Sequence, residues 1–136
     1  MPDIIDMRKL IIIFAAILLI TGCKKTEKEP LGPTDIRVKN LSNVTMDDLT
    51  VETGGGTYNF GTLGAGDTTD YYRFEMAYPK ANIFAFIDGQ KYKTDTAIYA
   101  YMQYLGQVKA TYEIFIENEA QKKLKINNVV MESPLK

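Results

Sequence analysis

Short stretches of alternating polar and apolar residues make up most of the chain after residue 33. In the first stretch Ile36 and Val38 alternate with Arg37 and Lys39, which is the period of two that a half-buried strand requires. Residues 81–88 are apolar on both faces, which indicates a central strand. The pattern predicts strands around residues 36–39 and 49–52, and over residues 57–63, 68–77, 81–88, 90–94, 97–105, 110–118 and 123–131.

Turn signals separate these stretches, and Asp88-Gly89 is the strongest because Asp-Gly between apolar runs is typical of a two-residue hairpin. Eight or nine short strands with no long helical window indicate an antiparallel sandwich or barrel, and the consecutive hairpins favour the sandwich. We therefore predict an all-β domain over residues 34–136, an antiparallel β-sandwich of about eight strands. It is immunoglobulin-like in architecture only, because the chain has no tryptophan for the cysteine–tryptophan core of antibody domains.

The N-terminal region follows a different pattern. Arg8 and Lys9 precede an unbroken apolar run over residues 10–20, and the small residues Thr21 and Gly22 follow. A basic, an apolar and then a small-residue region is the layout of a secretory signal peptide. The apolar run has eleven residues. At a rise of ~1.5 Å each they cover about half of the hydrocarbon core of a membrane, so we do not expect a permanent spanning helix.

Ile20-Thr21-Gly22-Cys23 resembles the lipobox of bacterial lipoproteins. The resemblance implies that residues 1–22 are removed and that Cys23 carries a diacylglycerol and an N-acyl chain, which hold the protein at a membrane. Cys23 is the sole cysteine, which fits a modified residue better than a disulfide. The alternative is an ordinary signal peptide followed by an incidental cysteine. Met7 is a candidate start of translation, because the preceding acidic residues do not suit a basic region.

Residues 23–33 contain charged residues, two prolines and a glycine after the cysteine, and we interpret them as a lipidated tether. Beyond them, residues 36–40, 58–61, 66–71 and 77–78 resemble segments of small lipoproteins common in Bacteroidota. The resemblance implies one β-sandwich domain, mostly of unassigned function, and supplies no catalytic residues. Lys24 follows the cysteine in place of an inner-membrane retention aspartate, so it also implies anchoring in the outer membrane, with the periplasmic or surface side open.

Composition limits the chemistry. The net charge is −1, and removal of residues 1–22 leaves it unchanged, so nothing favours nucleic acid as a partner. Histidine is absent, and neither Ser42 nor Ser133 lies in a nucleophile motif. The acidic pairs fall at predicted turns or strand ends, and Asp67 with Asp70 would supply too few oxygens for calcium. We therefore expect no enzyme activity, no metal and no cofactor beyond the lipid on Cys23. A hydrolase would need two acids that converge in a cleft.

Tyrosine is the unusual feature, with nine residues against no tryptophan. On a strand over residues 97–105, Tyr99 and Tyr101 would share one face. These rings either pack across strands or form a flat platform for a sugar or a protein. The expected function is a lipid-anchored cell-envelope protein with a non-enzymatic binding or assembly module, whose partner is an unknown envelope protein or glycan. The alternative is a carbohydrate-binding accessory lipoprotein that uses exposed tyrosines.

Two short motifs predict modification. Asp67-Thr68-Thr69 and Asp95-Thr96-Ala97 resemble the O-glycosylation site of exported Bacteroidota proteins, and both follow turn signals. The resemblance implies a glycan on Thr68 or Thr96. The alternative is that the two threonines begin strands, where β-branched residues fit well.

Overall fold

The computed structural model of the protein describes residues 30–134. In this part of the chain there are eight strands and no helix, and hence no helix that could cross a membrane. The strands are β1 (Thr34–Asn40), β2 (Met46–Glu52), β3 (Thr57–Leu63), β4 (Tyr72–Phe74), β5 (Asn82–Ile87), β6 (Gln90–Lys93), β7 (Val108–Asn118) and β8 (Lys123–Pro134). The predicted all-β class and number of strands are confirmed. The predicted signal peptide, Cys23 and the tether up to residue 29 lie outside the described residues.

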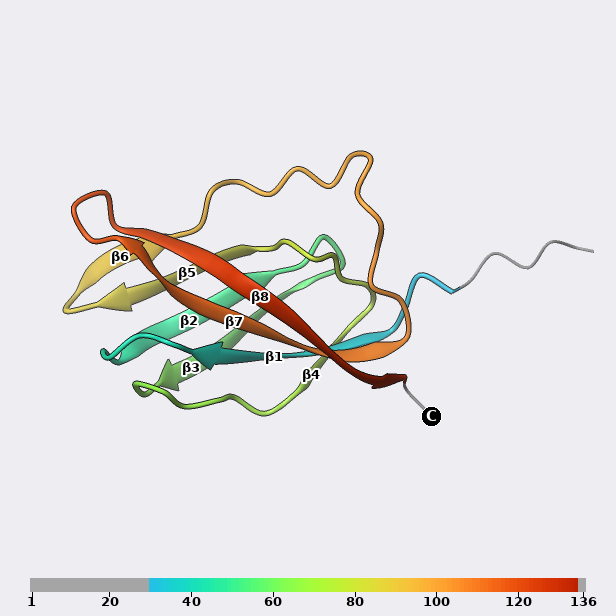
Figure 1. The fold of residues 1–136 in the computed structure, drawn as a ribbon, viewed down its shortest axis with the longest axis horizontal. Helices are drawn as coiled ribbons and strands as arrows, with labels where there is room; N and C mark the ends of the chain where they lie inside the picture. Colours follow the sequence, from blue (N-terminus) through green and yellow to red (C-terminus); the bar gives the residue numbers. More distant parts are fainter. Residues whose placement is uncertain (1–29, 135–136) are drawn as a thin grey trace, which may run out of the picture.

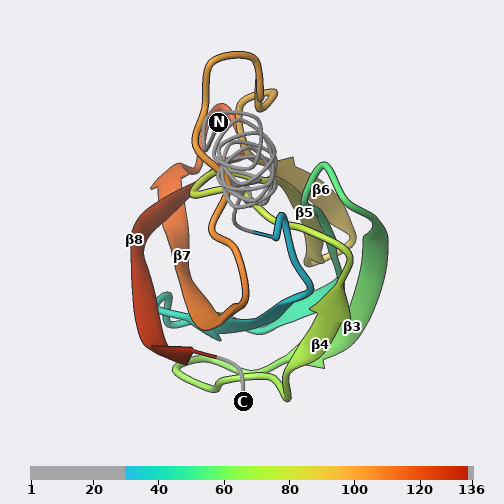
Figure 2. The ribbon, with the colours of Figure 1, turned by 90° about the vertical axis from the view of Figure 1, so that its right-hand side faces the viewer.

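All eight strands belong to one hydrogen-bonded sheet, in the order β3-β2-β5-β6-β8-β7-β1-β4 (Figure 1). Seen along the strands, the sheet curls round into a nearly closed ring (Figure 2). Most neighbours are antiparallel as predicted, but β1 with β7 and β6 with β8 are parallel.

The ring has two seams, where neighbouring strands scarcely pair. At the first seam the edge strands β3 and β4 face each other without a ladder between them. At the second seam β6 and β8 share a single residue pair, Lys93 with Lys123. The seams divide the sheet into two four-stranded halves, β3-β2-β5-β6 and β8-β7-β1-β4. The predicted sandwich of two separate sheets is not confirmed, because this one pair keeps the halves in a continuous sheet.

The core lies inside the ring and follows from the alternation in the sequence. Ile36, Val38, Ile83 and Ala85 are all buried, while the residues between them are turned outward. The largest fully buried side chain is Tyr112, whose hydroxyl donates a hydrogen bond to the Tyr78 carbonyl oxygen at 2.5 Å. That bond satisfies the only polar atom of the ring, so a tyrosine can occupy the core.

The predicted strand over residues 68–77 is wrong in length, because only β4 forms. The residues before β4 still run alongside β1, with a bridge between Lys39 and Thr68. However, the Val38 N–H donates to the side-chain oxygen of Thr69 at 3.0 Å, and this hydroxyl donates to the Asp70 carbonyl at 2.8 Å. A side chain therefore takes the place of a backbone partner and interrupts the ladder.

The predicted strand over residues 97–105 is also wrong, since residues 94–107 form an irregular segment without a strand partner among the described residues. The Met102 N–H donates to the Tyr99 carbonyl at 3.1 Å, and Tyr101 between them has a φ of 66°. This turn reverses the chain where a strand would need extended backbone.

Asn40, at the end of β1, joins the two halves at one end of the first seam. Its side chain is fully buried, and its amide nitrogen donates to the carbonyls of Val44 (2.7 Å), Leu63 (3.3 Å) and Gly64 (3.1 Å). Its amide oxygen accepts from the backbone N–H and hydroxyl of Ser42. One amide thus satisfies carbonyls from the loop after β1, from the last residue of β3 and from the turn that follows β3.

We expect Asn40→Asp to lower the free energy of unfolding by about 3 kcal/mol, because a carboxylate would be buried against three carbonyl oxygens with no donor between them. Urea unfolding at pH 7 measures this. Asn43→Asp, at an exposed position of the same loop, is the matched control and should stay near the wild-type value. A loss below 1 kcal/mol for Asn40→Asp would contradict this role of Asn40.

Candidate functional site

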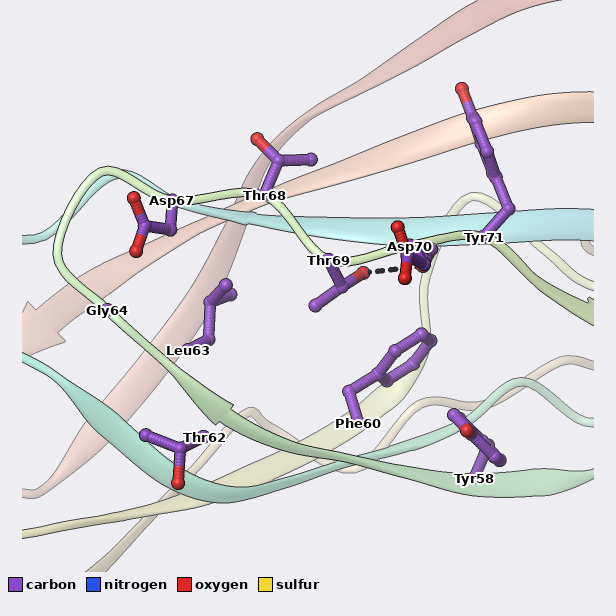
Figure 3. Close-up of a pocket in the computed structure, with 10 residues that line it drawn as sticks. All are labelled: Tyr58, Phe60, Thr62, Leu63, Gly64, Asp67, Thr68, Thr69, Asp70 and Tyr71. Atoms are coloured by element: carbon purple, nitrogen blue, oxygen red, sulfur yellow. Dashed lines mark hydrogen bonds between the residues drawn. The ribbon is translucent and has the colours of Figure 1, made fainter.

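A groove of about 450 Å³ follows the first seam, between β3 and the segment that leads to β4 (Figure 3). We call it the β3 groove. It is lined by Tyr58, Phe60, Thr62, Leu63, Gly64, Asp67, Thr68, Thr69, Asp70 and Tyr71. One of its walls is a sheet edge, because β3 pairs with β2 on one side and with no described strand on the other. Such an edge presents backbone donors and acceptors to a ligand.

Aromatic side chains close the seam at one end of the β3 groove. The rings of Tyr58 and Tyr72 stack at 3.7 Å between centroids and 11° between planes, so they join β3 to β4 where backbone pairing is missing. Phe60 and Phe74 meet this pair edge-on, each at 4.9 Å. Tyr58 and Tyr72 nevertheless stay 38% and 37% exposed, so the rings also offer apolar surface to solvent.

The polar side chains of the β3 groove come from the segment after β3. Gly64–Asp67 is a turn with Gly66 at a φ of 75°, and the Asp67 carboxylate folds back over Gly64, where a Cβ would lie 2.5 Å from its oxygen. Figure 3 shows Asp67 and Thr69 turned toward β3, while Thr68 and Tyr71 point to the other side of the segment. Carboxylate, hydroxyl and aromatic groups therefore meet in one open groove, which can bind a polar ligand by hydrogen bonds and ring contacts.

A second groove, of about 410 Å³, follows the second seam. Its walls are the start of β8, the end of β7, the irregular segment after β6 and the two residues before β5. They carry Lys80, Ala81, Thr94, Asp95, Thr96, Ala97, Ile98, Met102, Glu117, Leu124, Lys125 and Ile126. The Lys123 ammonium lies 2.9 Å from Asp95 and 3.3 Å from Glu117, so ion pairs bridge the seam where the ladder is reduced to one residue pair. Within residues 30–134 no three metal-ligating side chains come together in either groove or elsewhere.

The structure separates Tyr99 from Tyr101, so the predicted shared strand face is wrong. The Tyr99 ring stacks on Tyr78 at 4.7 Å, and its hydroxyl donates to the backbone oxygen and the carboxylate of Glu52 at 3.0 and 3.1 Å. The pKa of Tyr99 is raised above its ordinary range, mainly because the side chain is buried and secondly because the negative Glu52 carboxylate lies beside it. Tyr101, two residues later, is fully exposed at the tip of the turn. The prediction assumed that side chains two residues apart lie on the same face, as in a strand. The turn at Tyr101 breaks this alternation.

The predicted glycosylation positions lie on different seams. Thr68 lines the β3 groove and Thr96 lines the second groove, and both are exposed. Modification of either residue stays a prediction.

Tyr58, Phe60 and Asp70 were not predicted as ligand-binding residues, although the first two were expected on a strand. Their alternation along β3 indicates which side faces inward, but the sequence alone does not reveal that β3 is a sheet edge.

No known protein family matches the sequence, and neither does any curated protein. Among solved structures, the chain is similar to the NMR structure of a protein from Eubacterium rectale, with a TM-score of 0.52 and 16% sequence identity. The likeness covers 75% of this chain and 95% of that chain. At this identity the comparison concerns the fold alone.

The stability of the protein should fall as the pH rises above 10. Burial raises the pKa of both Tyr99 and Tyr112 above the ordinary value of 10.0, to which they return in the unfolded chain. Below pH 10 the phenols are neutral in both states and their contribution is complete, whereas above it the unfolded chain ionises first and is favoured. Urea unfolding between pH 8 and pH 11 should show a smaller alkaline loss for Tyr99→Phe than for wild type. Tyr101→Phe is the matched control, and an equal loss in all three proteins would contradict the prediction.

Proposed function

We propose that this chain is a lipid-anchored protein of the cell envelope. The basic, apolar and small-residue leader and the sole cysteine at its end support this. Two or more acyl chains anchor a protein stably where one does not, and Lys24 and Lys25 would add attraction to anionic headgroups. Lys24 after the cysteine supports the outer membrane as the location.

We propose further that the domain is a non-enzymatic binding or assembly module, and the β3 groove is the observation that carries this. The groove combines a sheet edge without a strand partner in residues 30–134, carboxylate and hydroxyl groups and partly exposed rings. Its two carboxylates, Asp67 and Asp70, are both solvent-exposed and can accept hydrogen bonds from a ligand. The absence of histidine from the sequence supports a binding role as well.

A carbohydrate is the second candidate for the ligand of this groove. Hydroxyl and carboxylate groups beside Tyr58 supply the hydrogen bonds and the ring contact that a sugar uses. The ring that would contact the sugar is Tyr58, which lines the β3 groove and stays 38% exposed. The predicted pair Tyr99 and Tyr101 does not line this groove.

Mass spectrometry of the protein from native membranes should find residues 1–22 removed and acyl chains on Cys23. Cys23→Ala should move the protein from the membrane fraction to the soluble fraction, because no acyl chain can then be attached. Lys24→Ala is the matched control and should stay in the membrane fraction. An unmodified Cys23 in membrane-derived protein would contradict the anchor.

Asp70→Arg should reduce capture of the ligand at least about tenfold, because it reverses the charge and fills the β3 groove. Retention from envelope extracts and binding to glycan arrays measure this, and they distinguish a protein from a sugar. Glu119→Arg, in the exposed turn between β7 and β8, makes the same change of charge far from the groove and should bind as wild type. Equal binding by Asp70→Arg and wild type would exclude the β3 groove as the site.

A further inference from the structure

The irregular segment after β6 has an unusual composition for a surface loop. From Ala97 to Val108 there is no charged residue over twelve positions, which read AIYAYMQYLGQV. The segment projects from the body of the domain (Figures 1 and 2). Projecting loops are normally polar, and exposed apolar patches mark places that contact a partner or a membrane.

The tip of this loop presents two large apolar side chains to solvent. Ile98 is 73% exposed and Tyr101 is fully exposed. Tyr101 has a φ of 66° in the turn closed by the bond from Met102 to Tyr99, at a place where glycine is ordinarily favoured. The chain therefore accepts a strained backbone to hold an aromatic ring outward, a combination that is typical of functional positions.

The two limbs of the loop are fixed to the domain. In the part of the loop that leads to the tip, the Tyr99 ring stacks on Tyr78, and the Tyr99 hydroxyl donates a hydrogen bond to the Glu52 backbone oxygen. In the part of the loop that follows the tip, the Leu105 N–H donates a hydrogen bond to the Ala77 carbonyl oxygen at 2.8 Å. The exposed tip is thus presented on a rigid base.

The base of the loop lies where the chain joins the domain from its N-terminal side. The Gln107 side chain donates to the Gly32 carbonyl at 3.1 Å, and the Thr34 hydroxyl donates to the Gly106 carbonyl at 2.6 Å. Only six residues lie between Cys23 and Pro30, so seven residue-to-residue steps join the two. They span at most about 25 Å when fully extended. A bilayer that holds Cys23 is therefore kept close to this loop.

We propose that Ile98 and Tyr101 insert into the headgroup region of the bilayer that holds Cys23, so that the loop is a second membrane contact. This inference rests on the proposed lipid anchor. A tyrosine places an apolar ring and a polar hydroxyl at such a boundary, and the uncharged loop has no charge to desolvate there. Lys80, which lines the second groove together with Ile98, is exposed and suits anionic headgroups. The contact fixes the domain on its tether instead of leaving it free to tilt.

The absence of tryptophan allows a direct test. The full-length lipidated protein carrying Tyr101→Trp is reconstituted in phosphatidylethanolamine–phosphatidylglycerol vesicles with brominated acyl chains. We expect the bromines to quench at least about half of the tryptophan emission, with a shift to the blue. Ala120→Trp is the matched control, because it lies in the exposed β7–β8 turn, which Figure 1 shows at the opposite end from the start of β1. The tryptophan of the Ala120→Trp protein should keep its emission in the same brominated vesicles.

Ile98→Asp in the Tyr101→Trp protein should abolish the quenching without lowering the melting temperature, since this side chain is mostly outside the core. A lipidated protein whose residue 101 tryptophan is not quenched overturns the loop contact alone. A tryptophan that shifts to the blue only when envelope proteins are added marks a protein contact and also overturns it. An unlipidated Cys23, seen in the intact mass, overturns the anchor and this inference together.

Discussion

The buried amide of Asn40 is the interaction on which the closure of the sheet depends. The strands on either side of the first seam do not pair, so something other than a ladder has to hold that side. Asn40 does so at one end with hydrogen bonds to three carbonyls, and Tyr58 with Tyr72 do so at the other end with stacked rings. Between these two fixed points the seam stays open, and the β3 groove occupies the gap. The same missing ladder thus creates both the need for Asn40 and the candidate site.

Most of the strands could be predicted because their alternation is local. β3 was placed over its full length, and the Asp88-Gly89 hairpin between β5 and β6 follows from two residues. The two incorrectly predicted strands do not form because of local interactions that the alternation of polar and apolar residues does not reveal. In one case the Thr69 hydroxyl replaces a backbone partner, and in the other a left-handed Tyr101 reverses the chain. Both segments are rich in β-branched or aromatic residues, which is the composition of a strand.

The candidate site could be predicted much less well than the strands. Tyr58 and Asp70 are brought together by the order of strands in the sheet, which is a property of long-range pairing. Tyr99 and Tyr101 were predicted to share one strand face as a possible ligand platform, but no strand forms there and the two side chains lie in different surroundings. The first holds the loop to Glu52 and Tyr78, and the second is free at its tip. A count of residue types cannot separate a structural ring from an exposed one.

The parallel pairing of β1 with β7 has a consequence for the order in which the protein folds. Asp35 pairs with Lys109 and Asn40 with Ile114, so one of the two neighbours of the first strand lies more than seventy residues later in the chain. The half-sheet β3-β2-β5-β6 can assemble from near neighbours, whereas the other half requires almost the whole chain to be present. The N-terminal strand is therefore among the last to be enclosed, and until then its apolar residues remain exposed to chaperones and proteases.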